Sequence, residues 1–177
     1  MSGNDLIAVT VIGNDRPGIV AGVTKVLYEL GCNLEDVTST ILRGHFAMML
    51  VVRAAPGASP SQVEEKLGAV ARDLGLVVSA RSVDEAALDV DAPTHMVSVY
   101  GADQPGIVFR VAQRLSERDV NVTDLTSRVI GEETEPVYAL MLEVVAPPDL
   151  ELASILSEVA RELEVEVSVH PVEADLL

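Results

Sequence analysis

The sequence predicts an α/β (α+β) protein built from two consecutive βαββαβ units. The stretch "GNDRPGIVAGVTKVL", from Gly13, matches "GADQPGIVFRVAQRL", from Gly101, at eight of fifteen positions. After both stretches, β-branched and amphipathic segments follow in the same order. Because self-similarity at a fixed spacing marks a repeated structural unit, the 177-residue chain is predicted to hold two similar domains.

The two copies stay aligned almost to the end of the chain. "CNLEDVTST", from Cys32, lies over "VNVTDLTSR", from Val120, and "FAMMLVVRAAP", from Phe46, lies over "YALMLEVVAPP", from Tyr138. Four extra residues enter the second copy near "GEETEP", and three are lost before its last helix. Both changes are predicted to fall in loops, where folds tolerate changes of length.

The predicted domains are residues 5–83 and 94–173, joined by an acidic linker at 84–93. Such small units have thin cores, so packing of the units against each other or against a second chain would be stabilising, and a homo-oligomer such as a dimer is expected. The composition, 49% apolar and 23% charged, is typical of a soluble globular protein. No apolar run reaches the roughly 18 residues of a membrane helix, and the polar start is unlike a signal peptide. The single cysteine fits a reducing compartment, so we expect a cytoplasmic protein without membrane contact.

The charge is strongly negative and unevenly distributed. The formal net charge is −16, and residues 94–177 carry sixteen acids against five bases. Binding to DNA or RNA depends on clustered Lys and Arg, so direct nucleic-acid binding is not expected. The acidity either keeps the protein soluble, or it allows the second half of the chain to attract a basic partner.

Each element of the first copy is predicted from its pattern. "LIAVTVIG" alternates as a strand does, and "NDRPG" then starts a helix, with Asp15 as the cap and Pro17 in the first turn. Gly31 ends that helix. One face of the helix is predicted to be apolar and buried, and it comprises Ile19, Val20, Val23, Leu27 and Leu30.

A strand hairpin, a second helix and a last strand complete the unit. "NLEDVTSTIL" and "FAMMLVVRA" are strands on either side of the turn "RGH". Ser59 or Ser61 caps a helix whose apolar positions include Val63 and Leu67, and "LVVSARSV" is the fourth strand. The second copy repeats this order, with helices from about Pro105 and about Leu150. A split βαβ of this kind gives a ferredoxin-like sandwich, in which two helices cover one face of a four-stranded antiparallel sheet.

The turn before the first helix suits a small anion. Gly13 lets the chain turn closely, and Gly18 places no side chain at the helix start. Unpaired amides and a partial positive charge there favour a carboxylate. Asp15 and Asn33 are candidate acceptors for an ammonium group, and Arg16 and Arg43 are candidate partners of a carboxylate.

The motifs "DRPGIVAGVTKVL" with "GCNLEDV", and "DQPGIVFRVAQRL" with "RDVNVTDL", resemble the ACT domain, a small βαββαβ module that binds amino acids and regulates metabolism. The second copy departs from the motif at Asp119, where Gly is usual, and at Val122, where Ile is usual. Two ACT-type repeats with nothing else resemble the glycine cleavage system transcriptional repressor family. The resemblance covers residues 5–173.

This resemblance implies a ligand held between the strand-to-helix loop of one domain and the second-strand start of a neighbour. The implied ligand is a small amino acid, with glycine or serine favoured. The implied residues of the first site are Asn14, Asp15, Arg16, Pro17, Gly18 and Asn33, and those of the second are Ala102, Asp103, Gln104, Pro105, Gly106 and Asn121.

The same residues also allow a purely structural interpretation. Asp15 and Asp103 can cap their helices and bind nothing, and Asn33 and Asn121 can simply start their strands. The replacement of Asn14 and Arg16 by Ala102 and Gln104 indicates that the two loops are not equivalent. The first loop, which is more polar, is the better candidate.

No catalytic constellation is predicted, and neither a cofactor nor a metal is expected. His45 is placed at the hairpin turn, and the other two histidines lie in predicted strands without a repeated counterpart. No HxxH or CxxC spacing occurs, so a zinc site is not predicted. We therefore expect a regulator that senses an amino acid and acts through a protein partner, such as a transcription factor or a metabolic enzyme. A ligand-free scaffold or regulatory subunit of a metabolic enzyme is the alternative.

Overall fold

The computed structural model describes residues 6–84, 91–131 and 136–172 of the chain. The chain divides into two compact units, residues 1–90 and 91–177, and each is described by itself. Most of the predicted linker, and most of the loop "GEETEP", lie outside the described residues. No described helix is long and apolar enough to cross a lipid bilayer.

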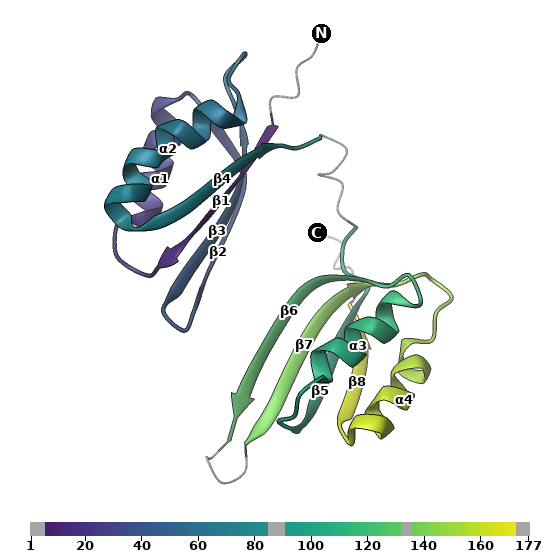
Figure 1. Ribbon diagram of the computed structural model, residues 1–177. Coiled ribbons are helices and arrows are strands. Elements are labelled where there is room, and N and C mark those ends of the chain that lie inside the picture. The colour runs from purple at the N-terminus through teal and green to yellow at the C-terminus, as the bar shows by residue number, and fades with distance from the viewer. Residues whose placement is uncertain (1–5, 85–90, 132–135, 173–177) are drawn as a thin grey trace. The chain divides into compact units, whose positions relative to one another are not determined.

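Both units have the predicted βαββαβ order, with the helices on one face of an antiparallel sheet (Figure 1). The sheet orders are β2-β3-β1-β4 and β6-β7-β5-β8. The first unit comprises β1 (Leu6–Asn14), α1 (Ile19–Glu29), β2 (Asn33–Leu42), β3 (His45–Arg53), α2 (Pro60–Leu74) and β4 (Leu76–Ser82). The second comprises β5 (His95–Ala102), α3 (Ile107–Ser116), β6 (Asn121–Ile130), β7 (Val137–Val145), α4 (Leu152–Leu163) and β8 (Glu166–Pro171).

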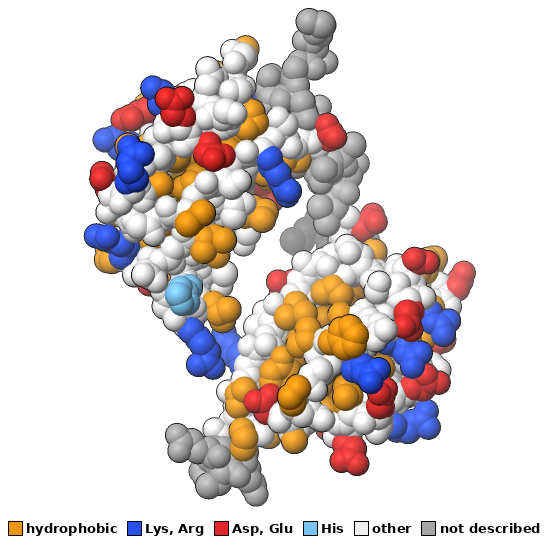
Figure 2. Space-filling model, in the orientation of Figure 1, with side chains coloured by type: hydrophobic (Ala, Val, Ile, Leu, Met, Phe, Trp, Pro, Cys, Tyr) orange, Lys and Arg blue, Asp and Glu red, His pale blue; other side chains and the backbone are white. Residues whose placement is uncertain are grey.

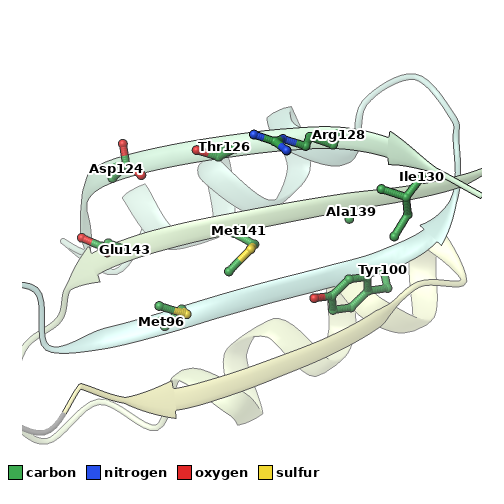
Figure 3. Close-up of a pocket in the computed structure, with 9 residues that line it drawn as sticks. All are labelled: Met96, Tyr100, Asp124, Thr126, Arg128, Ile130, Ala139, Met141 and Glu143. Carbon is green, nitrogen blue, oxygen red and sulfur yellow. The ribbon is translucent and has the colours of Figure 1, made fainter. Parts of the chain in front are cut away.

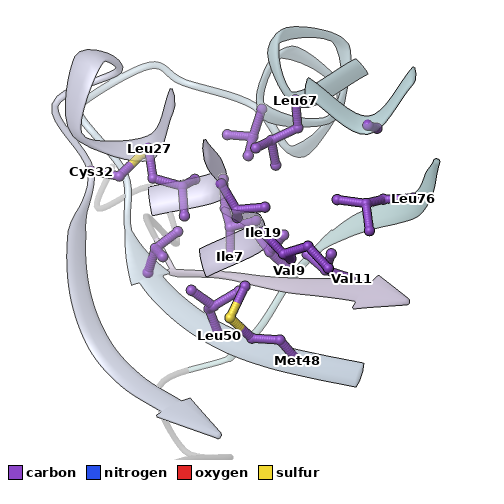
Figure 4. Packing of buried hydrophobic residues seen from close by; sticks show 14 of the residues in the cluster. Ile7, Val9, Val11, Ile19, Leu27, Cys32, Met48, Leu50, Leu67 and Leu76 are labelled. Atoms are coloured by element: carbon purple, nitrogen blue, oxygen red, sulfur yellow. The ribbon is translucent and has the colours of Figure 1, made fainter. Parts of the chain in front are cut away.

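Each unit has its own apolar core between the helices and the sheet. In the first unit, Leu27 of α1, Leu50 of β3 and Leu67 of α2 all belong to this core and have no exposed surface (Figure 4). The predicted apolar face of α1 is confirmed for Ile19, but Val20 is 49% exposed and the prediction for it is wrong. Helical residues next to each other point about 100° apart, so Val20 turns away from the sheet that Ile19 covers.

The lone cysteine is buried. Cys32 follows α1 and packs among the residues of the first core. Burial raises the pKa of the Cys32 thiol, and a backbone hydrogen bond with Ala55 opposes this in part. The thiol is therefore held neutral and behaves as a small apolar side chain.

Helix α2 begins with a capping box. The Ser59 hydroxyl accepts a hydrogen bond from the Gln62 amide at 3.3 Å, and the Gln62 side chain accepts one from the Ser59 amide at 2.9 Å. Ser59→Ala is expected to lower the stability of the first unit by about 0.5–2 kcal/mol, because the Gln62 amide loses its partner. Urea denaturation measures this loss. Ser61→Ala, one position inside the helix, is the control and should change stability little.

The length difference at the last helix is not in a loop, and that prediction is wrong. Six residues lie between the end of β3 and the start of α2, and six also lie between the end of β7 and the start of α4. Helix α2 has 15 residues and α4 has 12. The three missing residues therefore shorten α4 by almost one turn.

Strands β2 and β6 form open edges of the two sheets. All ten residues of β2 are exposed, including Val37 and Ile41. Both edge strands carry a bulge at the same place, between Leu34 and Asp36 and between Val122 and Asp124. Large apolar side chains thus reach the surface of both units (Figure 2).

Candidate functional site

The loop after β1 is shaped by two glycines. A Cβ at Gly13 would meet Leu76 Cδ2 at 2.6 Å and the Gly75 carbonyl oxygen at 3.0 Å, so the close contact between β1 and the start of β4 requires glycine. Gly18, with φ +96°, is the residue before α1 and has a conformation that side chains rarely adopt. Gly101 and Gly106 repeat both features in the second unit.

The predicted helix cap is wrong. Helix α1 begins at Ile19, and no side chain caps it, so Asp15 does not have the role that the sequence indicated. Pro17 lies before the helix and not in its first turn, because the left-handed conformation of Gly18 delays the helix start. Helix α3 starts in the same way at Ile107, after Gly106 and without a side-chain cap from Asp103.

The first amides of α1 are consequently available. The first helical hydrogen bond runs from the Gly22 amide to the Gly18 carbonyl at 2.8 Å. In the described part of the chain, the amides of Ile19, Val20 and Ala21 have no acceptor. Such amides, at the positive end of the helix dipole, can receive a carboxylate.

Three polar side chains surround these amides. Asn14, Asp15 and Arg16 are exposed, and their side chains make no hydrogen bond or ion pair with any described residue. The Asp15 amide donates to the Gly44 carbonyl at 2.8 Å and so fixes the loop to the turn between β2 and β3. That turn consists of Arg43 and Gly44, both with positive φ, and His45 is already the first residue of β3. Both candidate arginines thus lie at one end of the sheet.

Asn33 lies at the opposite end of the sheet. In the strand register, Asn14 pairs with His45, which pairs with Leu42, whereas Asn33 pairs with Arg53 at the far end. Ten residues of β2 span about 30 Å, so Asn33 and Asp15 of one unit do not share a ligand. Asn33 instead donates to the Glu35 carboxylate at 3.2 Å, and Arg53 bonds the same oxygen at 3.1 Å. Asn121 occupies the equivalent place at the start of β6.

The second loop is held by its own unit. Gln104 Nε2 donates to the Leu163 carbonyl, in the last turn of α4, at 2.6 Å. Ala102, Asp103 and Pro105 are exposed, and the Asp103 side chain has no partner among the described residues. Gln104, which stands where the first loop has Arg16, is thus hydrogen-bonded to the backbone of its own unit. The two loops are therefore not equivalent.

The described residues contain no group of three or more His, Cys, Asp or Glu side chains that could hold a metal ion. The three histidines lie in separate strands: His45 in β3, His95 in β5 and His170 in β8. The loop between β1 and α1, with its uncapped helix start and unpartnered polar side chains, is the candidate site, and its groups suit a small zwitterion.

Comparisons with known proteins agree with this architecture. Family models described as the ACT domain match residues 5–81 and 95–154. The UPF0237 protein MK1213 of Methanopyrus kandleri is 46% identical over 77 residues, which are 43% of this chain and 86% of that protein. The glycine cleavage system transcriptional repressor of Escherichia coli is 25% identical over 157 residues, which are 88% of this chain and 82% of that protein.

Two further similarities extend over most of the chain. Phosphoserine phosphatase SerB2 of Mycobacterium tuberculosis is 28% identical over 168 residues, which are 93% of this chain but 40% of the phosphatase. The crystal structure of an unknown protein from Galdieria sulphuraria has a TM-score of 0.82 at 24% identity and covers 95% of this chain and 98% of that one. The second similarity concerns the fold alone.

Proposed function

Since the chain belongs to the ACT-domain family, with two such domains in tandem, we propose that it is a regulatory protein that binds a small amino acid and acts through a protein partner. The name of its distant relative, the glycine cleavage system transcriptional repressor, supports glycine as the first candidate. Serine, which also has a small side chain, is proposed as the second. The observation that carries the proposal is the uncapped start of α1, surrounded by the unpartnered side chains of Asn14, Asp15 and Arg16.

Each group of an amino acid has a matching group in this loop. The carboxylate accepts hydrogen bonds from the first amides of α1, a contact that contributes about 0.3–1 kcal/mol at the surface and up to about 2 kcal/mol when partly buried. Arg16 adds a charge-assisted pair with the same carboxylate. The ammonium group is placed against the Asp15 carboxylate.

The second wall of the site is proposed to come from another ACT-type domain. If β2 of one domain pairs antiparallel with β2 of another, Asn33 of one copy lies next to Leu42 of the other. Leu42 is at the same sheet end as the candidate loop. In this arrangement Asn33 of one copy lies at the same end of the sheet as Asp15 of the other copy. Within one unit the two residues are about 30 Å apart. The ligand then stabilises the association, with coupling of about 1–3 kcal/mol.

The partner is proposed to be a protein, because the chain is too acidic for nucleic acid. A net charge of −16 repels phosphate groups, whereas a basic surface on a DNA-binding regulator or a metabolic enzyme would be attracted to it. Regulation, and not catalysis, is the proposed role. Co-purification with the native partner tests this part of the proposal.

A thermal-shift panel of the twenty amino acids tests ligand binding. An amino acid present at about 100 times its Kd adds about 2.7 kcal/mol to the stability of the unit that binds it. We expect glycine or serine to produce this shift and Arg16→Ala to abolish most of it. Gln104→Ala, at the matching position of the second loop, is the control and should keep the shift. A panel without any shift at millimolar concentration would favour the ligand-free scaffold instead.

A further inference from the structure

The sheet of the second unit has a hollow on its outer face, the face turned away from α3 and α4. Its volume is about 420 Å³ (Figure 3). The small residue Ala139 on β7 lies between Arg128 on β6 and Tyr100 on β5. In the next row along the strands, Met141 lies beside Ser98.

Large and small side chains alternate across this face. Tyr100 and Met141 are 37% and 42% exposed and stand above the sheet, whereas Ser98 is only 8% exposed. Such a pattern of projections and depressions suits a surface with the same pattern, because packed sheets interdigitate their side chains at a distance of about 10 Å.

We propose that this face binds the same face of a second copy of the chain, about a two-fold axis that runs parallel to the strands between β7 and β5. This axis places Tyr100 of each copy over Ala139 of the other. It also places Met141 over Ser98 and fills the hollow from both sides. An isologous contact of this kind closes on itself as a dimer.

The charges of Arg128 and Glu166 agree with this axis. In one copy, Arg128 on β6 and Glu166 on β8 lie in the same row, three strand spacings or about 14 Å apart. Neither side chain has a partner among the described residues. The two-fold exchanges the positions of β6 and β8, so that Arg128 of each copy faces Glu166 of the other. Asp124 and His170, which share another row, face each other in the same way.

The first unit does not carry this pattern. The position that matches Arg128 is Thr40, and the position that matches Glu166 is Val77. Tyr100 is matched by Ile12. The contact is therefore specific to the second unit, and it is independent of the amino-acid site in the first.

Charge exchange tests the arrangement. Sedimentation equilibrium of the full chain should show dimers that Arg128→Glu and Glu166→Arg each weaken by about tenfold, because each places like charges in contact. The double variant R128E/E166R should recover the affinity of the parent. Val77→Arg, at the position of the first unit that matches Glu166, is the control and should change nothing. Both substituted side chains are exposed, and circular dichroism should confirm that the variants fold.

A second pair of variants tests the apolar part. Met141→Lys should weaken the dimer, and Met49→Lys, at the matching and similarly exposed position of the first unit, should not. A chain that sediments as a monomer at all concentrations overturns the proposal. Unchanged association of both single charge variants also overturns it, and a double variant that stays weakened overturns the two-fold axis.

Discussion

Replacing Leu27 with alanine is expected to lower the free energy of unfolding of the first unit by about 2–5 kcal/mol. Leu27 has no exposed surface and lies in the core beside Leu50 and Leu67, so its loss leaves a cavity that the sheet cannot close. Urea denaturation of the full chain should show the transition of the first unit moving to lower urea concentration. The transition of the second unit should stay in place, because that unit has a core of its own.

Leu115→Ala is the matched variant, since Leu115 holds the same position in α3 and is equally buried. Leu115→Ala should move the transition of the second unit to lower urea concentration. Tyr28→Ala, next to Leu27 but with a side chain 80% exposed, should change stability by less than about 0.5 kcal/mol. If Leu27→Ala shifted both transitions equally, the two units would not unfold independently. With the transitions assigned in this way, the unit that an amino acid stabilises can be identified directly.

Gly18→Leu is expected to remove amino-acid binding and to destabilise the first unit by roughly 1–3 kcal/mol. No atom lies within 4 Å of a Cβ at this position, so the cost is backbone strain at φ +96° and not a collision. The new side chain stands at the uncapped amides of α1, where the carboxylate is proposed to bind. The thermal shift with glycine or serine should disappear.

Gly57→Leu separates strain from binding. Gly57 has φ +83° and equally open surroundings, but it lies between β3 and α2, in a different loop from the candidate site. Gly57→Leu should lower the stability of the first unit by a similar amount and keep the thermal shift with glycine or serine. Gly106→Leu examines the second loop in the same way. A shift that survives in Gly18→Leu would place the ligand elsewhere.

Much of the fold was predictable because the signals were local and were repeated. Alternation predicted the strands, and Ser59 was one of the two residues predicted to cap α2. The cap of α1 was mispredicted because Asp15 and Pro17 have the composition of a helix start, whereas the left-handed Gly18 decides where the helix begins. The shorter α4 was missed because an alignment of sequences does not say whether a gap lies in a loop or a helix.

The candidate site was predictable only in part. The loop from Asn14 to Gly18 was found from its motif, but its distance from Asn33 depends on the strand register, which the sequence does not state. The outer face of the second sheet illustrates the same limit. The alternation of Thr126, Arg128 and Ile130 indicates a shared face, but only the pairing of β6 with β7 places Arg128 beside Ala139.

The bulges in β2 and β6 also bear on how the chain avoids forming fibres. An open edge of ten residues is a template on which strands of other molecules can add without end. A bulge interrupts the regular spacing of the unpaired backbone groups and twists the strand. A strand that adds to either edge therefore meets an irregular row of backbone groups, which favours pairing with one matching strand over the unlimited addition that forms a fibre.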